Sequence, residues 1–324
     1  MKLSRRDLLI SAGGMLAASA LPAWAGPARA LRGRAFGASW KLVSGGAFDE
    51  VAVHAAIESV VESVDGAMSP FRADSEITRF NGADTTGWQP LSADTCVVLR
   101  EGLRVAALTS DAFNPTVGPL VGRYGFGPIG GTETGGAREI GLRDGMVRKL
   151  RPSLSLDLCG IAKGHALDRI VSACTALGLT DFLVELGGEV YARGRHPGGR
   201  GWHVGVERPL ADTTGLLQLV VGLDGQALAT SGNAVNGYRY GARRYSHIID
   251  PTTARPADTT LASVTVVAAS AITADAMATA LYAMGPERGP DFAEAQGIEA
   301  LFISEDGGNL RETATSGFSA RILA

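Results

Sequence analysis

The 324-residue sequence has little charge, few cysteines and no long apolar run. Charged residues make up 19% of it and the formal net charge is −3, which argues against a nucleic-acid-binding protein that works through bulk positive charge. Beyond the N-terminus, no apolar run reaches the ~20 residues that a membrane-spanning helix needs. The three cysteines fit neither a Cys-x-x-Cys motif nor a zinc pattern, and we interpret them as free buried thiols: Cys96, Cys159 and Cys174.

What the sequence does contain is typical of a folded protein with many turns. Hydrophobic residues account for 45% of the chain, which is enough for a core and excludes a disordered polypeptide. The 43 glycines and 14 prolines predict many turns and loops. A chain of this length is compatible with two domains or with one large unit.

The N-terminal residues predict an export signal. Arg5 and Arg6 precede a weakly hydrophobic segment that ends near Ala23. Cleavage patterns of the A-x-A type follow at residues 23–25 and 28–30. This order is typical of a twin-arginine signal peptide.

We therefore predict a signal peptide over residues 1–30 and a folded domain over residues 31–324. After cleavage the protein is expected to be soluble in the periplasm. An N-terminal membrane anchor is the alternative. It is disfavoured because the apolar run is short and is interrupted by Gly13, Gly14 and Pro22.

The spacing of apolar residues predicts an α+β fold in which strands and helices are mixed without regular βαβ alternation. Helices are expected at residues 48–64, 75–82, 92–108, 160–177, 271–284 and 285–295. Strands are expected at residues 34–43, 154–158, 182–186, 189–194, 202–207, 216–223, 226–230, 243–249, 262–269, 299–304 and 308–312. The glycine-rich segment 122–145 is expected to be a long loop.

A strand-to-helix junction at residues 157–164 is suited to bind a phosphate group. The segment reads Asp-Leu-Cys-Gly-Ile-Ala-Lys-Gly, so a strand ends at Asp157 and a helix begins after Gly160. Free N–H groups at the start of a helix, together with the charge of Lys163, favour an anion. The segment is neither a Walker A loop nor a G-x-G-x-x-G motif, and by itself an ordinary capped turn is the simpler interpretation.

Two further segments carry groups with possible chemistry. Asp275 and Thr279 are four residues apart on an apolar helix, so their oxygens share one face and form hard ligands that suit Mg²⁺. His247 precedes Asp250 and Pro251, and a histidine near its ordinary pKa of ~6.5 can act as a general base. In an extended chain Asp250 points away from His247, so it is a poor candidate to orient the imidazole. Taken singly, each segment also fits a purely structural role.

Seven segments in order resemble the ApbE family of FAD:protein FMN transferases, over nearly the whole chain after the signal. These segments are residues 68–81, 112–119, 157–164, 184–189, 230–232, 246–251 and 274–281. The resemblance implies an α+β, T-fold-related architecture. It also implies Mg²⁺-dependent transfer of FMN from FAD to a Thr or Ser hydroxyl of a target protein, with release of AMP.

The resemblance also implies roles for particular residues. The residues that would bind FAD are Phe36, Ala112, Phe113, Asn114, Asp157, Lys163 and Ile249. The carbonyls of Gly160 and Ala278 and the side chains of Asp275 and Thr279 would bind Mg²⁺. His247 would be the catalytic base. The sequence departs from the family pattern at three positions: Phe36 replaces Met, Asn114 replaces Asp, and Ala254 replaces Gly.

The resemblance further implies that the acceptor is a redox protein, membrane-bound with a periplasmic domain. Candidates are a respiratory complex of the sodium-pumping NADH:quinone oxidoreductase or Rnf type, or a regulator of nitrous oxide respiration. Two alternatives remain open at this point. One is a Mg²⁺-dependent FAD pyrophosphatase, in which water replaces the acceptor hydroxyl; the other is a non-catalytic periplasmic flavin-binding protein.

Overall fold

The computed structural model describes residues 28–210, 215–232, 238–240, 243–257 and 260–323. The helices are α1 (Glu50–Met68), α2 (Glu76–Gly82), α3 (Ala93–Leu108), α4 (Gly118–Arg123), η1 (Ala137–Glu139, a 3₁₀ turn), α5 (Ala162–Ala176), α6 (Ala271–Ala295) and α7 (Ser316–Ser319). The strands of the first half are β1 (Arg29–Ala35), β2 (Ala38–Ser44), β3 (Gln89–Pro90), β4 (Ile140–Arg143), β5 (Met146–Lys149), β6 (Phe182–Leu186) and β7 (Glu189–Arg193). Those that follow are β8 (Trp202–Glu207), β9 (Leu217–Leu223), β10 (Gln226–Gly232), β11 (Tyr238–Tyr240), β12 (Arg243–Tyr245), β13 (Ile249–Asp250), β14 (Arg255–Pro256), β15 (Leu261–Ala268), β16 (Glu299–Asp306) and β17 (Asn309–Ala314).

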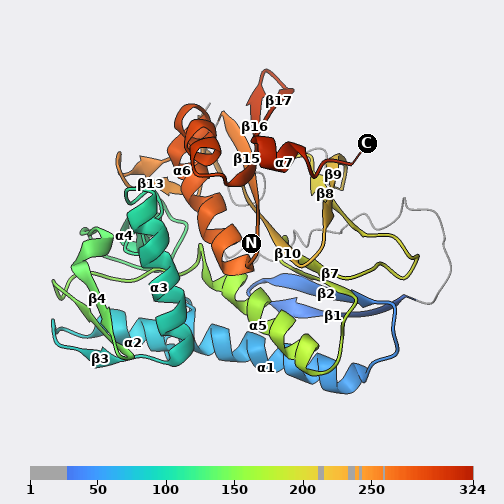
Figure 1. The fold of residues 1–324 in the computed structure, drawn as a ribbon. Helices are drawn as coiled ribbons and strands as arrows, with labels where there is room; N and C mark the ends of the chain where they lie inside the picture. Colours follow the sequence, from blue (N-terminus) through green and yellow to red (C-terminus); the bar gives the residue numbers. More distant parts are fainter. Residues whose placement is uncertain (1–27, 211–214, 233–237, 241–242, 258–259, 324) are drawn as a thin grey trace, which may run out of the picture.

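The predicted α+β class is confirmed by an eight-stranded sheet that forms the centre of the molecule (Figure 1). Its strand order is β1-β2-β6-β7-β10-β15-β16-β17, and every neighbouring pair is antiparallel. The order of strands across the sheet is therefore the order in which they occur along the chain.

Helices cover one face of this sheet. α6 packs against β10, β15 and β16, and α5 lies between α6 and α1 (Figure 1). Large side chains fill the space between the layers without solvent contact, among them Trp40, Phe182, Tyr282 and Phe302. Burial of this apolar surface is the main force that holds the helices on the sheet.

The opposite face carries a second apolar cluster. The β8–β9 hairpin and α7 pack there, and Trp202, Val221 and Phe318 are buried against it. A smaller sheet, β3-β5-β4, stands beside α2 at the left of Figure 1. The molecule thus has three layers, with the small sheet at one side.

Several helices begin where the sequence supplies a capping side chain. The side chains of Asp49, Ser75 and Ser92 accept hydrogen bonds from the backbone N–H groups of the first turns of α1, α2 and α3. α6 is interrupted at Gly285, which has φ 80°, a value that favours glycine. The two successive helices predicted at 271–284 and 285–295 are therefore confirmed: α6 consists of two helical segments that meet in a kink at Gly285.

The predicted strand at 34–43 is wrong, because the chain reverses within it. β1 and β2 form a hairpin whose turn residues, Phe36 and Gly37, have φ of 51° and 77°. Two left-handed residues make the tight turn that suits the twist of paired strands. The alternating pattern runs straight through the turn, so apolar spacing did not reveal it.

Two other expectations for the middle of the chain are corrected. Part of the glycine-rich segment 122–145 is ordered as η1 and β4, with Asp144 and Gly145 turning the chain into β5. Residues 154–158, predicted as a strand, form neither strand nor helix. The side chain of Asn81 takes the place of a strand partner: its Oδ1 accepts from Leu156 N at 2.7 Å and its Nδ2 donates to Leu156 O at 2.8 Å.

Residues 1–27 lie outside the described residues, so the predicted signal peptide remains a prediction. Arg29 and Ala30, at the end of the predicted signal, already pair with β2. Within the described part of the chain, no helix is long and apolar enough to span a membrane. All three cysteines are free, as expected, but only Cys96 and Cys174 are buried; Cys159 is exposed, which corrects the expectation for that thiol.

Candidate active site

The turn that leads into α5 lies against the first turns of α6. Gly160 approaches Thr279 so closely that a Cβ atom at residue 160 would lie 3.3 Å from Thr279 Oγ1. In the first turn of α5, the backbone N–H of Gly164 donates to Asp275 Oδ2 at 2.9 Å. The structure therefore brings Gly160, Asp275 and Thr279 together, as the resemblance implies for a metal site. Ala278, on the same helix, is fully buried.

Lys163 lies beside this group and contacts a carboxylate that sequence reasoning did not assign. Its Nζ is 2.5 Å from Glu189 Oε1 and donates to Gly187 O at 3.3 Å. Glu189 is almost fully buried, and its Oε2 has no hydrogen-bond partner among the described residues. The nearby Glu185 is also buried and accepts a hydrogen bond from Gly188 N at 2.8 Å.

These groups have shifted ionisation. Burial raises the pKa of Asp275, and burial raises the pKa of Glu189 to about 8 against the opposing charge of Lys163. For Lys163, burial lowers the pKa, but the carboxylates of Glu189 and Asp275 outweigh burial, so the ammonium form is stabilised. One ammonium therefore faces three buried carboxyl groups, and the raised pKa of Glu189 favours the protonated form of that group at neutral pH.

Asp157 is held where the segment 154–158 enters the turn before α5. Its backbone N–H donates to Pro115 O at 2.7 Å, and its Oδ1 accepts from Cys159 N at 3.0 Å. Burial raises the pKa of Asp157, and the hydrogen bond from Cys159 opposes that shift. The carboxyl group therefore stands next to the turn that carries Gly160.

Ala112, Phe113 and Asn114 are buried in the loop after α3. The ring of Phe113 lies against Gly160, where a Cβ atom would be 3.5 Å away. The Asn114 amide is used within the protein, because Nδ2 donates to Gly135 O and Oδ1 accepts from Thr116 N, both at 2.8 Å. The loop thus lies beside the turn that carries Gly160, and the Asn114 side chain shapes the backbone of the loop.

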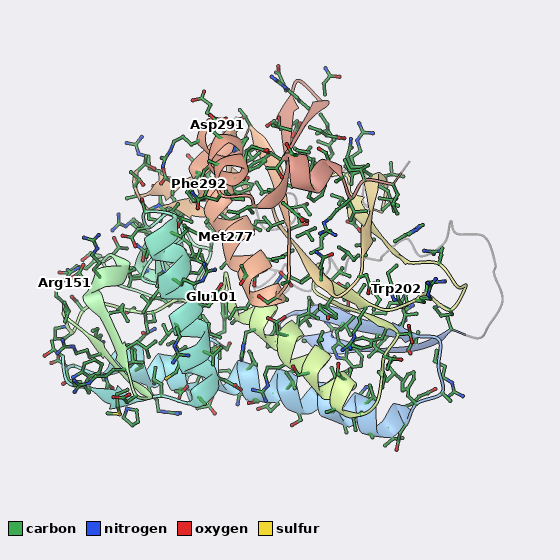
Figure 2. The ribbon with its side chains drawn as sticks, in the orientation of Figure 1. Glu101, Arg151, Trp202, Met277, Asp291 and Phe292 are labelled. Atoms are coloured by element: carbon green, nitrogen blue, oxygen red, sulfur yellow. The ribbon has the colours of Figure 1, made fainter. Side chains whose placement is uncertain are left out.

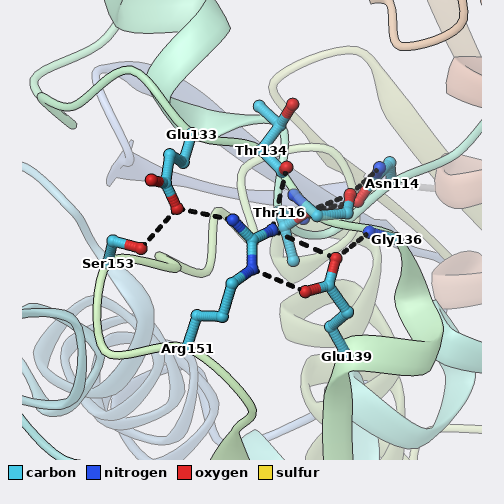
Figure 3. A network of polar contacts seen from close by, with 9 residues as sticks. Asn114, Thr116, Glu133, Thr134, Gly136, Glu139, Arg151 and Ser153 are labelled. Carbon is cyan, nitrogen blue, oxygen red and sulfur yellow. Dashed lines mark hydrogen bonds and ion pairs between the residues drawn. The ribbon is translucent and has the colours of Figure 1, made fainter.

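Figure 3 shows how this loop is fastened to the segment 133–139. Arg151 forms ion pairs with Glu139 at 2.7 Å and with Glu133 at 2.5 Å. Its guanidinium also donates to Thr134 O at 3.3 Å, next to the Gly135 carbonyl that Asn114 and Thr116 bind. Arg151, through Glu133 and Glu139, and the Asn114–Thr116 turn therefore both hold the segment 133–139 in place.

His247 lies in a bend between β12 and β13, not in the continuous strand predicted at 243–249. The bend breaks the expected alternation, because Ile248 and Ile249 are both buried. The ring packs against Phe126 with centroids 6.2 Å apart, and its Nδ1 is buried without a partner among the described residues. Asp250 instead binds Thr252 N and Thr253 Oγ1, both at 2.9 Å, which confirms that it does not orient His247.

The ionisation of His247 differs from the sequence-based expectation. Burial, and then the charge of Lys163, lower the pKa of His247 to about 4. The expected pKa of ~6.5 is therefore wrong for this ring. At neutral pH the imidazole is uncharged and can accept a proton, as a general base must.

The other two residues that resemblance assigns to FAD reach the site from different sides. Ile249 belongs to β13, which contacts α6. Phe36 is partly buried in the turn before Ala38, and a Cβ atom at Gly187 would lie 3.1 Å from Ala38 Cβ and 3.5 Å from the Lys163 side chain. The β1–β2 turn therefore reaches the site through Gly187.

Sequence reasoning missed three neighbours of the site: Glu189, Ser231 and Phe126. The Ser231 hydroxyl on β10 is 3.3 Å from Thr279 Oγ1. Glu189 and Ser231 lie in two of the segments that resemble the family, which is the signal that could have marked them. Phe126 lies in the glycine-rich segment, where no pattern distinguishes it.

The site is separate from a cavity of about 350 Å³ between α3, α6 and β15. That cavity borders α6 through Thr273 and Met277 (Met277 is labelled in Figure 2). None of the predicted site residues lines it. Within the described ranges, no three His, Cys, Asp or Glu side chains converge as a metal-binding group.

Comparison with known proteins identifies the family. The ApbE family model matches residues 36–302. A Vibrio cholerae protein named FAD:protein FMN transferase is 35% identical over 286 residues, which cover 84% of this chain and 85% of that protein. The Escherichia coli K12 protein of the same name is 30% identical over 313 residues, covering 91% of this chain and 89% of its own.

Solved structures agree with this assignment. The flavin transferase ApbE from Vibrio cholerae superposes with a TM-score of 0.81 at 33% identity, covering 91% of this chain and all of that one. The apo flavinyl transferase ApbE from Pseudomonas stutzeri gives a TM-score of 0.81 at 30% identity, covering 91% of this chain and 96% of that one. The order of the matched segments, the fold and the relatives all lead to one conclusion: this chain belongs to the ApbE family.

Proposed function

We propose that this chain is a Mg²⁺-dependent FAD:protein FMN transferase. It splits the pyrophosphate of FAD, joins FMN through its phosphate to a Thr or Ser hydroxyl of a target protein, and releases AMP. The observation that carries the proposal is the meeting of Gly160, Asp275 and Thr279 next to Lys163, in a chain of the ApbE family.

The donor set fits Mg²⁺. Asp275 uses Oδ2 to accept from Gly164 N, and its Oδ1 has no hydrogen bond within the described residues. Thr279 adds a hydroxyl oxygen, and the backbones of Gly160 and Ala278 add carbonyl oxygens. One carboxylate with neutral oxygens and substrate phosphates is a usual Mg²⁺ environment. Bound there, Mg²⁺ would neutralise charge on the pyrophosphate and at the phosphorus under attack.

The chain's own residues bind and orient FAD. Lys163 places an ammonium beside the proposed Mg²⁺ ligands. The ammonium has further N–H donors, so it can contact the pyrophosphate of FAD while it keeps its hydrogen bond to Glu189. Asp157 stands on the same turn as Gly160. The remaining residues that we assign to the FAD pocket are Phe36, Ala112, Phe113, Asn114 and Ile249.

His247 supplies the base. A Thr or Ser hydroxyl is a weak nucleophile and needs a neighbouring proton acceptor. We assign that role to the imidazole, which is neutral because its pKa is about 4 and which lies close enough to Lys163 to be affected by its charge. The hydroxyl oxygen bonds to the FMN phosphorus and its proton passes to His247. The P–O bond to AMP breaks, and AMP leaves with the electron pair.

The decisive experiment is to incubate the purified protein with FAD, Mg²⁺ and a candidate periplasmic redox protein, and to measure the intact mass of that acceptor. Transfer predicts a mass gain equal to one esterified FMN, with AMP in solution. It also predicts no gain when the acceptor Thr is replaced by Ala or when EDTA removes Mg²⁺. AMP and free FMN without a mass gain would instead identify an FAD pyrophosphatase. FAD binding without any product would identify a flavin-binding protein.

The acceptor and the compartment are part of the proposal. The paired arginines and the A-x-A patterns support export to the periplasm, where the acceptor would be the exposed domain of a membrane-bound redox protein. A respiratory complex and a regulator of nitrous oxide respiration are the two candidate classes. Testing one acceptor of each class in the mass assay distinguishes them.

A further inference from the structure

The N-terminus of α6 is capped by a neighbouring helix. Ser270, the residue at the cap position, makes no side-chain hydrogen bond to the backbone of α6 and donates instead to Thr273 Oγ1 at 2.9 Å. Asp168, on α5, accepts hydrogen bonds from Ala271 N at 2.7 Å and Ile272 N at 3.0 Å. A carboxylate at this end of a helix also interacts favourably with the helix dipole.

Among the described residues, this cap is one of two hydrogen-bonded contacts between α5 and α6. The other joins Gly164 N to Asp275 Oδ2. Gly164 precedes Asp168 by four residues and Ala271 precedes Asp275 by four, so the bonds are one turn apart on each helix. Two contacts at this spacing fix the rotation of α6 and also its position along its axis.

A third contact holds the first turn of α6, on the side that faces α3. Thr273 Oγ1 donates to Glu101 Oε1 at 2.6 Å, and Glu101 belongs to α3. The helix start is therefore fastened to α5 and α3 by side chains that lie outside the proposed metal ligands. Asp275, Ala278 and Thr279 follow within two turns of this start.

We propose that Asp168 is a positioning residue for the Mg²⁺ site: by capping α6 from α5, it keeps Asp275 and Thr279 in register with Gly160. The inference rests on the proposed function. Mg²⁺ requires near-ideal octahedral geometry at short ligand distances, so a small slide of α6 disturbs the site. The FAD contacts that α5 and the loop after α3 would make do not depend on the position of α6 along its axis.

The test compares Asp168→Asn and Asp168→Ala with the wild-type protein. Two quantities are measured: Mg²⁺ binding by calorimetry on the FAD-loaded protein, and FAD binding in EDTA. Loss of an outer partner of a metal site typically costs about 10- to 100-fold in metal affinity. We expect that loss for Asp168→Ala, a smaller loss for Asp168→Asn, an unchanged FAD dissociation constant, and recovery of transfer at high Mg²⁺.

Glu294→Gln is the matched control. Glu294 also caps a helix from outside it, because its carboxylate accepts from Ser316 N at 2.9 Å and from Ser316 Oγ at 2.7 Å at the start of α7. Its loss should lower the melting temperature and leave Mg²⁺ affinity unchanged. If the Asp168 variants behave in the same way, Asp168 has only a structural role and the inference is wrong.

A second variant keeps the inference testable if the Asp168 variants do not fold. Thr273→Val removes the bond to Glu101 and should weaken Mg²⁺ binding in the same direction by a smaller factor. Unchanged Mg²⁺ affinity in Thr273→Val would contradict positioning through the start of α6. A wild-type protein that neither binds Mg²⁺ nor transfers FMN would overturn the proposed function itself, and the inference with it.

Discussion

The side chains of the site place three buried carboxyl groups around a single lysine. Lys163 shares its surroundings with Glu185, Glu189 and Asp275, and FAD would add the negative charge of a pyrophosphate. Burying unpaired charge is costly. In the proposed function, the pyrophosphate would therefore depend on Lys163 and on Mg²⁺ together, so FAD binding should be sensitive to substitution of Lys163.

Replacing Lys163 with Ala should weaken FAD binding by about 10- to 100-fold, which corresponds to the loss of one charge-assisted hydrogen bond. Transfer should slow in parallel, because the pyrophosphate loses its cation. Titration of flavin fluorescence measures the first effect and acceptor mass the second. Lys163→Arg keeps the charge and should recover part of the affinity. Equal FAD affinity in Lys163→Ala and wild type would remove Lys163 from the FAD site.

Replacing His247 with Ala should separate binding from chemistry. Loss of a general base costs about 10² to 10⁴ in rate, whereas a neutral ring contributes no charge to FAD binding. Acceptor mass over time measures the rate, and flavin titration measures binding. A variant that transfers FMN at the wild-type rate would refute the assignment.

The pH dependence of the wild-type rate is a separate prediction. The neutral ring is the base, and it is lost as pH falls through the pKa of about 4. The acid limb of kcat/KM that belongs to His247 should therefore lie near pH 4. It should be absent from the residual rate of His247→Ala. An acid limb near pH 6.5 that disappears with the ring would show that His247 is solvated during turnover.

At the level of helices and strands, the sequence predicted an element correctly where the spacing of buried apolar residues alone determines it. The long helices and the strands from β6 to β10 follow the spacing of their apolar residues. The prediction was wrong where a single side chain or a single turn determines the local structure. Asn81 replaces a strand partner for Leu156, more than seventy residues away in sequence, and Phe36 adopts a left-handed turn that few non-glycine residues favour.

The candidate site shows the same limit. Spacing within α6 placed Asp275 and Thr279 on one face, but the approach of Gly160 to Thr279 joins residues that are distant along the chain. Only the family resemblance predicted that meeting. The role of Glu189 depends on β7, α5 and the turn at Gly187 coming together, so no local pattern could reveal it.

The close contact between α5 and α6 predicts how a methyl group at residue 164 would affect stability and Mg²⁺ binding. A Cβ atom at Gly164 would lie 2.4 Å from Ala271 O and 2.8 Å from Asp275 Cβ, so one of the helices must move. We expect Gly164→Ala to lower the free energy of unfolding by about 1–3 kcal/mol and to weaken Mg²⁺ binding. Urea denaturation measures the first effect and calorimetry the second.

Gly66→Ala is the control for that substitution. Gly66 lies inside α1, and a Cβ atom there would meet nothing within 4 Å. Alanine should therefore raise the free energy of unfolding by about 0.5–1 kcal/mol through helix preference alone. A Gly164→Ala protein that is as stable as Gly66→Ala and binds Mg²⁺ normally would contradict this prediction. It would show that α5 and α6 can move apart without a loss in the free energy of unfolding.

At the scale of the whole molecule, the position of β1 predicts which of the two A-x-A patterns is the cleavage site of the signal peptide. Cleavage after Ala25 leaves β1 intact, whereas cleavage after Ala30 removes Arg29 and Ala30, which pair with Ser44 and Val43. We therefore expect the mature chain to begin at Gly26. N-terminal sequencing of protein from the periplasm measures this directly, and a first residue of Leu31 would contradict it.

Changing both Arg5 and Arg6 to Lys should abolish export, because twin-arginine transport depends on the arginine pair. The expected result is unprocessed protein in the cytoplasm and an acceptor without FMN. Cell fractionation and immunoblotting measure the distribution, and Arg143→Lys/Arg148→Lys, changed together at the small sheet, serves as the control. Normal processing of the Arg5→Lys/Arg6→Lys variant would mean that another signal directs the protein.

The strand order of the large sheet has a consequence for how the chain folds. Strands β6, β7, β10, β15, β16 and β17 all come from the second half of the chain, and only β1 and β2 come from before α1. Pairing β2 with β6 therefore closes a loop from Ser44 to Phe182, a longer connection than any between other neighbouring strands of the sheet. Loop closure costs entropy, and contacts between distant residues form slowly. The N-terminal hairpin should consequently join last during refolding, and burial of Trp40, which lies on β2, would report that step.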